Sequence, residues 1–65
     1  MKLNQYEGEK ARITDIDGQV FYGHVTDYIY AEDNVPEGES IILKTLEGVY
    51  IEFRREEIKE IEIIK

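Results

Sequence analysis

The side chains best suited to binding chemistry are aromatic groups within one long β-prone stretch, residues 17–31 (Asp-Gly-Gln-Val-Phe-Tyr-Gly-His-Val-Thr-Asp-Tyr-Ile-Tyr-Ala). Successive side chains of a strand point to opposite faces, so a strand here places four such groups on one face: Tyr22, His24, Tyr28 and Tyr30. This tyrosine stripe, with Tyr50 as a candidate neighbour, can stack nucleic-acid bases or anchor a protein partner. It can equally pack across strands, where each pair contributes about 0.2–1 kcal/mol. All three interpretations stay open.

A second candidate site is the pair Arg54 and Arg55, the only adjacent basic residues in the sequence. Guanidinium groups can contact phosphate or the carboxylates of a partner. Three carboxylates, Glu52, Glu56 and Glu57, are close enough in sequence to pair with these arginines. Such surface ion pairs contribute about 0–1 kcal/mol. We favour the ion pairs over a binding role.

No pattern in the sequence predicts catalysis, a metal site or a cofactor. There is no cysteine and only one histidine, His24, so thiolate chemistry is excluded and one imidazole lacks the further ligands of a zinc site. Asp15 and Asp17 match only a truncated calcium loop without its distal glutamate, and Asp17-Gly18 is a strong hairpin signal. The acidic segment 31–39 has irregular ligand spacing and is predicted to be a solvated loop. We therefore expect a protein that is not an enzyme.

Size and charge restrict the partners. The 65 residues carry 15 acidic and 8 basic side chains, for a net charge of −7, and predict one domain over residues 1–65. This charge repels phosphate backbones, so RNA binding is possible but disfavoured, and it opposes attraction to anionic membranes. No apolar run follows the first residues as in a signal peptide, and the absence of cysteine fits a reducing compartment. We expect a cytoplasmic protein without membrane contact.

The elements that position these groups are predicted to be mainly β-strands. Alternating apolar residues and turn signals predict five strands, over residues 10–15, 19–31, 40–45, 49–53 and 58–64. A short helix is expected over residues 3–8, ended by Gly8, and a single helical turn over residues 54–57. Gly18 and Gly48 are predicted to form the hairpin turns.

The longest strand is expected to bend at Gly23 and to be shared by both halves of a small barrel. Asp27 falls among the core positions of that strand, and burying an unpaired carboxylate is costly. We therefore expect a bulge after Val25 that turns Asp27 outward. The residues predicted to face the core are Ala11, Ile13, Phe21, Gly23, Val25, Ile29, Ile41, Leu43, Val49, Ile51, Phe53, Ile61 and Ile63.

Two motifs resemble those of the Sm-like superfamily. Gly18 and Gly23 flank the aromatic Phe21 and are followed by Val25, preceded by Ile13, which is similar to the first Sm-like motif. Residues 49–53 and 58–64 are similar to the strand pair of the second motif. The resemblance implies a five-stranded, strongly bent SH3-like or Sm-like barrel with a short N-terminal helix. In that superfamily, rings can form when the fourth strand of one copy pairs with the fifth strand of the next.

The same resemblance implies an RNA pocket that this sequence matches only in part. Sm-like proteins hold uridine or adenine with an aspartate and an asparagine after the long strand, and with an arginine-glycine pair after the fourth strand. Ile29 stands where the aspartate is expected, Asn34 comes later, and Arg54 is followed by Arg55 in place of glycine. The pocket therefore carries over for Arg54 and, loosely, for Asn34.

These observations predict a non-catalytic Sm-like interaction module that binds a protein partner or self-associates. The alternative is an RNA-associated factor of Sm-like or ribosome-maturation type. The candidate contact residues for either role are Tyr22, Tyr28, Tyr30, Asn34, Arg54 and Arg55. The residues with predicted structural roles are Gly8, Gly18, Gly23 and Gly48.

Overall fold

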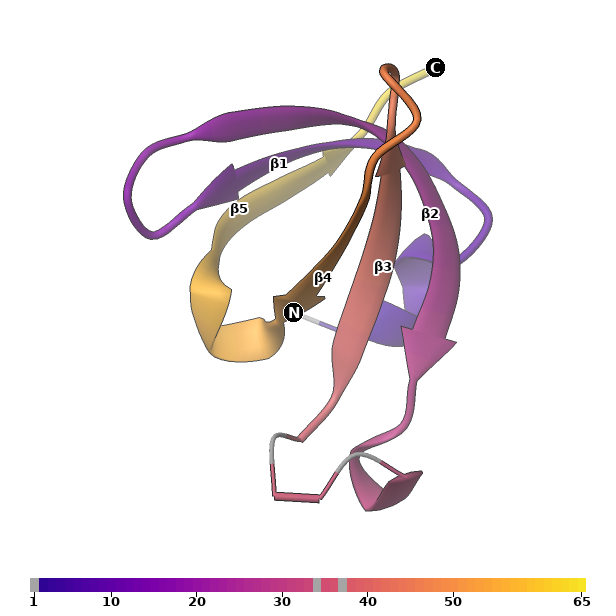
Figure 1. Ribbon diagram of the computed structural model, residues 1–65, viewed down its shortest axis with the longest axis vertical. Coiled ribbons are helices and arrows are strands. Elements are labelled where there is room, and N and C mark those ends of the chain that lie inside the picture. Colours follow the sequence, from indigo (N-terminus) through magenta and orange to yellow (C-terminus); the bar gives the residue numbers. More distant parts are fainter. Residues whose placement is uncertain (1, 34, 37) are drawn as a thin grey trace.

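A computed structural model describes residues 2–33, 35–36 and 38–65 and shows a mainly β protein (Figure 1). The strands are β1 (Lys10–Asp15), β2 (Val20–Ile29), β3 (Ser40–Thr45), β4 (Tyr50–Arg54) and β5 (Ile58–Ile63). They form one antiparallel sheet in the order β4-β3-β2-β1-β5. Within the described residues β4 and β5 do not pair, so this sheet is not closed. The five predicted strands are confirmed, whereas a closed barrel is not observed.

The strand β2 is shared by both halves of the sheet. Its pairing with β1 runs from Val20 to His24, and its pairing with β3 runs from Gly23 to Ile29; its curvature is visible in Figure 1. Gly23 is buried where the two pairings overlap. A Cβ atom at this position would lie 2.2 Å from the carbonyl oxygen of Lys44, so the close approach of β3 requires glycine. The sequence predicts a bend at Gly23, whereas the feature that the structure shows there is the close approach of β3.

A bulge interrupts β2 where the sequence predicts one. The register with β3 shifts between Val25 and Asp27, and Asp27 is exposed. The Thr26 hydroxyl donates a 2.9 Å hydrogen bond to the Asp27 carboxylate. The extra residue also exchanges the two faces of the strand beyond it, so that Tyr28 lies opposite the buried Ile41. Ile29 lies opposite Ser40, on the other face, and its predicted place in the core is wrong.

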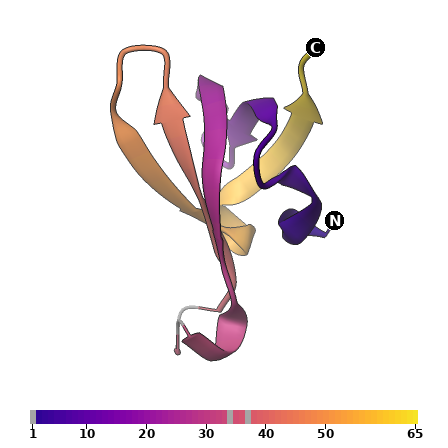
Figure 2. The same ribbon diagram turned by 90° about the vertical axis from the view of Figure 1, so that its right-hand side faces the viewer.

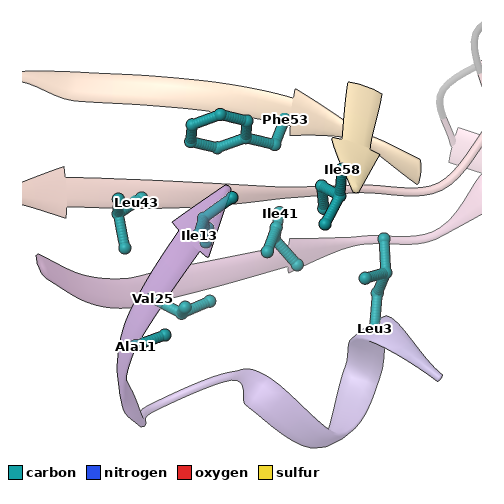
Figure 3. Close-up of a cluster of buried hydrophobic side chains, with 8 residues drawn as sticks. All are labelled: Leu3, Ala11, Ile13, Val25, Ile41, Leu43, Phe53 and Ile58. Atoms are coloured by element: carbon teal, nitrogen blue, oxygen red, sulfur yellow. The ribbon is translucent and has the colours of Figure 1, made fainter. Parts of the chain in front are cut away.

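The core draws side chains from every strand and from the N-terminal turn (Figure 3). Its buried members are Leu3, Ala11, Ile13, Val25, Ile41, Leu43, Phe53 and Ile58. Phe21, Ile51 and Ile61 are partly buried against it, and the Phe21 and Phe53 rings meet edge-to-face at 5.3 Å. Most of the predicted core is therefore confirmed.

Two predicted core residues are exposed. Val49 is 55% exposed because it precedes β4 and belongs to the turn between β3 and β4. Ile63 is 38% exposed because it ends β5, an edge strand with one neighbour. Ile58, at the other end of β5, is buried instead. The register of β5 shifts at Thr14 and Asp15 of β1, an irregularity that alternation alone does not predict.

The predicted N-terminal helix is a single 3-10 turn, η1 (Leu3–Tyr6), which Figure 2 shows beside the sheet. Four residues are too few for α-helical hydrogen bonds, and 3-10 geometry is usual at this length. Leu3 is buried and Tyr6 packs on the core. The other 3-10 turns are η2 (Ala31–Asp33) and η3 (Arg55–Glu57); η3 is the helical turn predicted before the last strand. The backbone φ of the predicted turn glycines Gly8, Gly18 and Gly48 is positive.

Candidate interaction face

The bulge in β2 divides the predicted tyrosine stripe into two groups. Tyr22 and His24 precede the bulge and lie exposed on the outer face of the sheet. Tyr28 follows it and packs on the core side, with its ring 5.0 Å from that of Tyr30 in an edge-to-face contact. The prediction of one continuous stripe is therefore wrong, because one extra residue moves Tyr28 to the opposite face.

The second group is engaged within the protein. The Tyr28 hydroxyl donates a 2.7 Å hydrogen bond to one oxygen of Glu39, and Arg55 forms an ion pair with the other oxygen. The hydrogen bond to the Glu39 carboxylate raises the pKa of Tyr28. Donation from Tyr28, and then from Arg55, lowers the pKa of Glu39. This Glu39 bridge ties the end of the acidic loop to η3.

The second arginine is also paired. The side-chain Nε of Arg54 lies 3.6 Å from Oε1 of Glu56 and 3.5 Å from Oε1 of Glu57. The backbone N–H of Arg54 also donates a 2.8 Å hydrogen bond to the Glu57 carboxylate. The predicted ion pairs of Arg54 are thus confirmed. The Arg55–Glu39 pair joins residues 16 positions apart, and no local sequence pattern indicates it. Asn34 lies outside the described residues.

A different group of side chains comes together across four strands. Lys10 pairs with His24, His24 pairs with Lys44, and Lys44 pairs with Tyr50. Directly paired residues lie side by side on one face of a sheet, so these four form a row on the exposed outer face. The Lys44 ammonium lies 5.7 Å from the centre of the Tyr50 ring, within the range of a cation–π contact.

A hollow of about 360 Å³ lies at this row. Its walls combine basic, aromatic and aliphatic groups: Lys10, Tyr22, Gly23, His24, Lys44, Thr45, Leu46 and Ile64. Leu46 is 80% exposed, and Tyr22, Tyr50 and Ile64 are also exposed. We call the hollow and the row beside it the lysine face, with members Lys10, Tyr22, His24, Lys44, Leu46, Tyr50 and Ile64.

The cations of the lysine face have no carboxylate partner within the described residues. Among the described residues, the basic members of ion pairs are Arg12, Arg54 and Arg55, none of which belongs to the lysine face. Arg12, which lies next to Tyr22 across β1 and β2, is neutralised by Glu60 and Glu62. Lys10 and Lys44 therefore form a local positive surface on a chain whose net charge is −7.

The groups of this arrangement are of kinds that can bind a partner. Residues 2–33, 35–36 and 38–65 contain no group of three or more His, Cys, Asp or Glu side chains placed to hold a metal ion. In the strand pairing the single imidazole of His24 lies between the amines of Lys10 and Lys44. Ammonium groups beside exposed aliphatic and aromatic surface can instead attract a partner that carries both carboxylates and apolar side chains.

Sequence patterns single out Tyr22 and His24 but not Lys10, Lys44 and Leu46. The signal for Lys10 is present: a hairpin centred on the Asp17-Gly18 turn places it opposite His24. The position of Lys44 on the other side of His24 depends on the register of β2 with β3. That register includes the region of the bulge, so the sequence alone does not settle it.

No family model, curated protein or solved structure matches the chain. Across the part of the chain that the structure describes, none of the helical turns has the length and apolar character needed to cross a membrane.

Proposed function

We propose that this chain is a non-catalytic interaction module of Sm-like barrel type that binds protein through the lysine face. The observation that carries the proposal is the uncovered apolar surface of Leu46, Tyr22 and Ile64 next to two lysines without a carboxylate partner in the described residues. Protein interfaces typically combine an apolar centre with a polar rim, and tyrosine is enriched among their dominant residues.

The Sm-like part of the proposal rests on the resemblance of the two motifs and is compatible with the sheet. β2 pairs with both β1 and β3, as the long bent strand of such a barrel does. β4 and β5 are the two edges of the sheet, which are the strands that a barrel of this type would bring together. A short N-terminal turn packs on the core through Leu3.

An RNA-associated role using Arg54, Arg55 and the tyrosines is less well supported. Both arginines already have carboxylate partners, and Tyr28 donates its hydroxyl to Glu39. Phosphate contacts dominate nucleic-acid affinity, and the net charge of −7 opposes them.

Site-specific photo-cross-linking in living cells tests the proposal. A benzophenone amino acid replaces Leu46 on the lysine face or, as a matched control, Lys59, which is exposed on β5. We expect discrete adducts from position 46 that protease removes and nuclease does not, and that weaken when Lys44→Glu is added. Nuclease-sensitive adducts would support the RNA alternative. Equal labelling from both positions, or none from position 46, would contradict a protein-binding lysine face.

A further inference from the structure

The β1–β2 hairpin carries an apolar side chain between two carboxylates. Its tip reads Asp15-Ile16-Asp17-Gly18, and Ile16 is 64% exposed. Figure 1 shows this hairpin projecting at one side of the molecule. Asp15 and Asp17 have no cationic partner within the described residues. The tip therefore has the combination of charge and apolar surface that is complementary to the lysine face.

The tip is held in one conformation. One oxygen of the Asp15 carboxylate accepts hydrogen bonds from the backbone N–H groups of Asp17 and Gln19, both at 2.9 Å. The backbone N–H of Ile16 donates to the carbonyl of Glu57 in η3 at 3.1 Å. A segment that is already ordered loses little conformational entropy on binding, which favours this tip as a binding element.

The tip and the lysine face of one molecule cannot meet each other. Lys10 begins β1 and Asp15 ends it, so the two lie about 17 Å apart at the strand rise of 3.4 Å per residue. Each copy therefore presents the acidic hairpin tip, which we call the knob, and the basic hollow of the lysine face at separate places. On the hollow, the Cα atoms of Lys10 and Lys44 are two strand spacings apart, about 10 Å, with His24 between them.

We propose that the lysine face binds a second copy of this chain, with Ile16 of one copy entering the hollow of the next. This inference rests on the proposed function and names its partner. Ile16 would cover the apolar surface of Leu46 and Tyr22, while Asp15 and Asp17 approach Lys10 and Lys44. Because the two contacting surfaces differ, the assembly is head-to-tail and either closes as a ring or extends as a filament.

Two copies with a net charge of −7 each repel one another. Salt weakens this long-range repulsion more than it weakens the attraction between charges in contact. At 0.1 M salt the Debye length is about 10 Å, which is shorter than the molecular dimensions of 29 × 24 × 21 Å. Repulsion between the distant acidic surfaces is therefore screened more strongly than attraction between charges in contact. We expect association to be weak at very low salt, strongest at intermediate salt and weaker again at high salt.

Paired charge reversals test the proposal by sedimentation velocity over a concentration series. Wild-type chain should sediment faster as its concentration rises. Lys44→Glu places acid in the hollow and Asp17→Lys places base on the knob, so each variant alone should remain a monomer. An equal mixture of the two variants should associate again, because the basic knob of one fits the acidic hollow of the other and the two unaltered surfaces still match.

The controls make the same charge changes elsewhere. Lys59→Glu and Glu32→Lys alter exposed residues away from both surfaces and should associate as the wild type does. Ile16→Ser removes the apolar contact without a change in charge and should also abolish association. Circular dichroism verifies that each variant is folded, which is expected because all the altered side chains are exposed.

Three results would overturn the proposal: a wild-type chain that stays monomeric at every concentration and salt, association that survives the single reversals, or a mixture that fails to restore it. If the chain is monomeric while position 46 still cross-links to another protein, the proposed function stands and only the identity of the partner is wrong.

Discussion

The polar groups on either side of the β2 bulge are used in opposite ways. Beyond the bulge, Tyr28, Glu39 and Arg55 satisfy one another through a hydrogen bond and an ion pair. Before it, Lys10 and Lys44 lie beside His24 without a carboxylate partner in the described residues. The difference separates groups that satisfy one another within the fold from groups that we propose are available to another molecule. Arg55, a candidate contact residue in the sequence, belongs to the first kind.

The largest expected effect on stability comes from substitution of Gly23, because Gly23 lies in the pairings of β2 with both β1 and β3. Gly23→Ala would place a Cβ atom 2.2 Å from the carbonyl oxygen of Lys44. Overpacking of this kind typically costs about 1–3 kcal/mol, and we expect a loss of that size in the free energy of unfolding measured by urea denaturation. His24→Ala, at an exposed neighbouring position, is the control and should change stability far less. A fully stable Gly23→Ala variant would mean that β3 does not approach β2 so closely.

The Glu39 bridge should contribute measurably to stability. Glu39→Gln keeps the size of the side chain but removes the charge that Tyr28 and Arg55 share. We expect a loss of about 0.5–1.5 kcal/mol, the usual net value of an intramolecular hydrogen bond, in the same urea measurement. Glu32→Gln, which removes a carboxylate from the exposed surface of η2, should have little effect. Equal losses in the two variants would indicate that the bridge does not stabilise the fold.

The same bridge predicts how stability depends on pH. The pKa of Glu39 is lowered from an ordinary value of 4.5, so its contribution is present above that pH and disappears as pH falls through the folded-state pKa. The pKa of Tyr28 is raised from 10.0, so its contribution is complete below pH 10.0 and is lost as pH rises through the folded-state pKa.

Urea denaturation at several pH values measures both effects. The stability difference between wild type and Glu39→Gln should shrink as the solution becomes more acidic than pH 4.5. The difference between wild type and Tyr28→Phe should shrink as it becomes more alkaline than pH 10.0. Differences that stay constant across both ranges would contradict the assignment of the bridge.

The smallest effect on stability is expected on the lysine face. Lys10→Gln removes an exposed charge with no carboxylate partner among the described residues. Surface substitutions of this kind usually change the free energy of unfolding by no more than about 0.5 kcal/mol. We expect an unchanged urea midpoint for this variant together with weaker cross-linking from position 46. A large loss of stability would show that Lys10 belongs to the fold rather than to a binding surface.

The elements of this protein could be predicted from its sequence because their signals are local. Alternation of apolar residues places Ala11, Ile13, Ile41 and Leu43 in the core, as observed. Turn glycines mark the hairpins, and the cost of burying Asp27 predicts the bulge after Val25, which the register confirms. Each of these inferences needs only the spacing of neighbouring residues and the chemistry of one side chain.

Which side chains share a face of the sheet, and which of them are paired, was decided only by the tertiary structure. The sequence indicates that a bulge is needed, but which side chains follow it to the other face depends on pairing with β3, and this separates Tyr28 from Tyr22. The Glu39–Arg55 pair and the row through Lys10, His24 and Lys44 join residues from different elements. Such contacts arise from strand order and register, which are set by the packing of the whole core rather than by any local pattern.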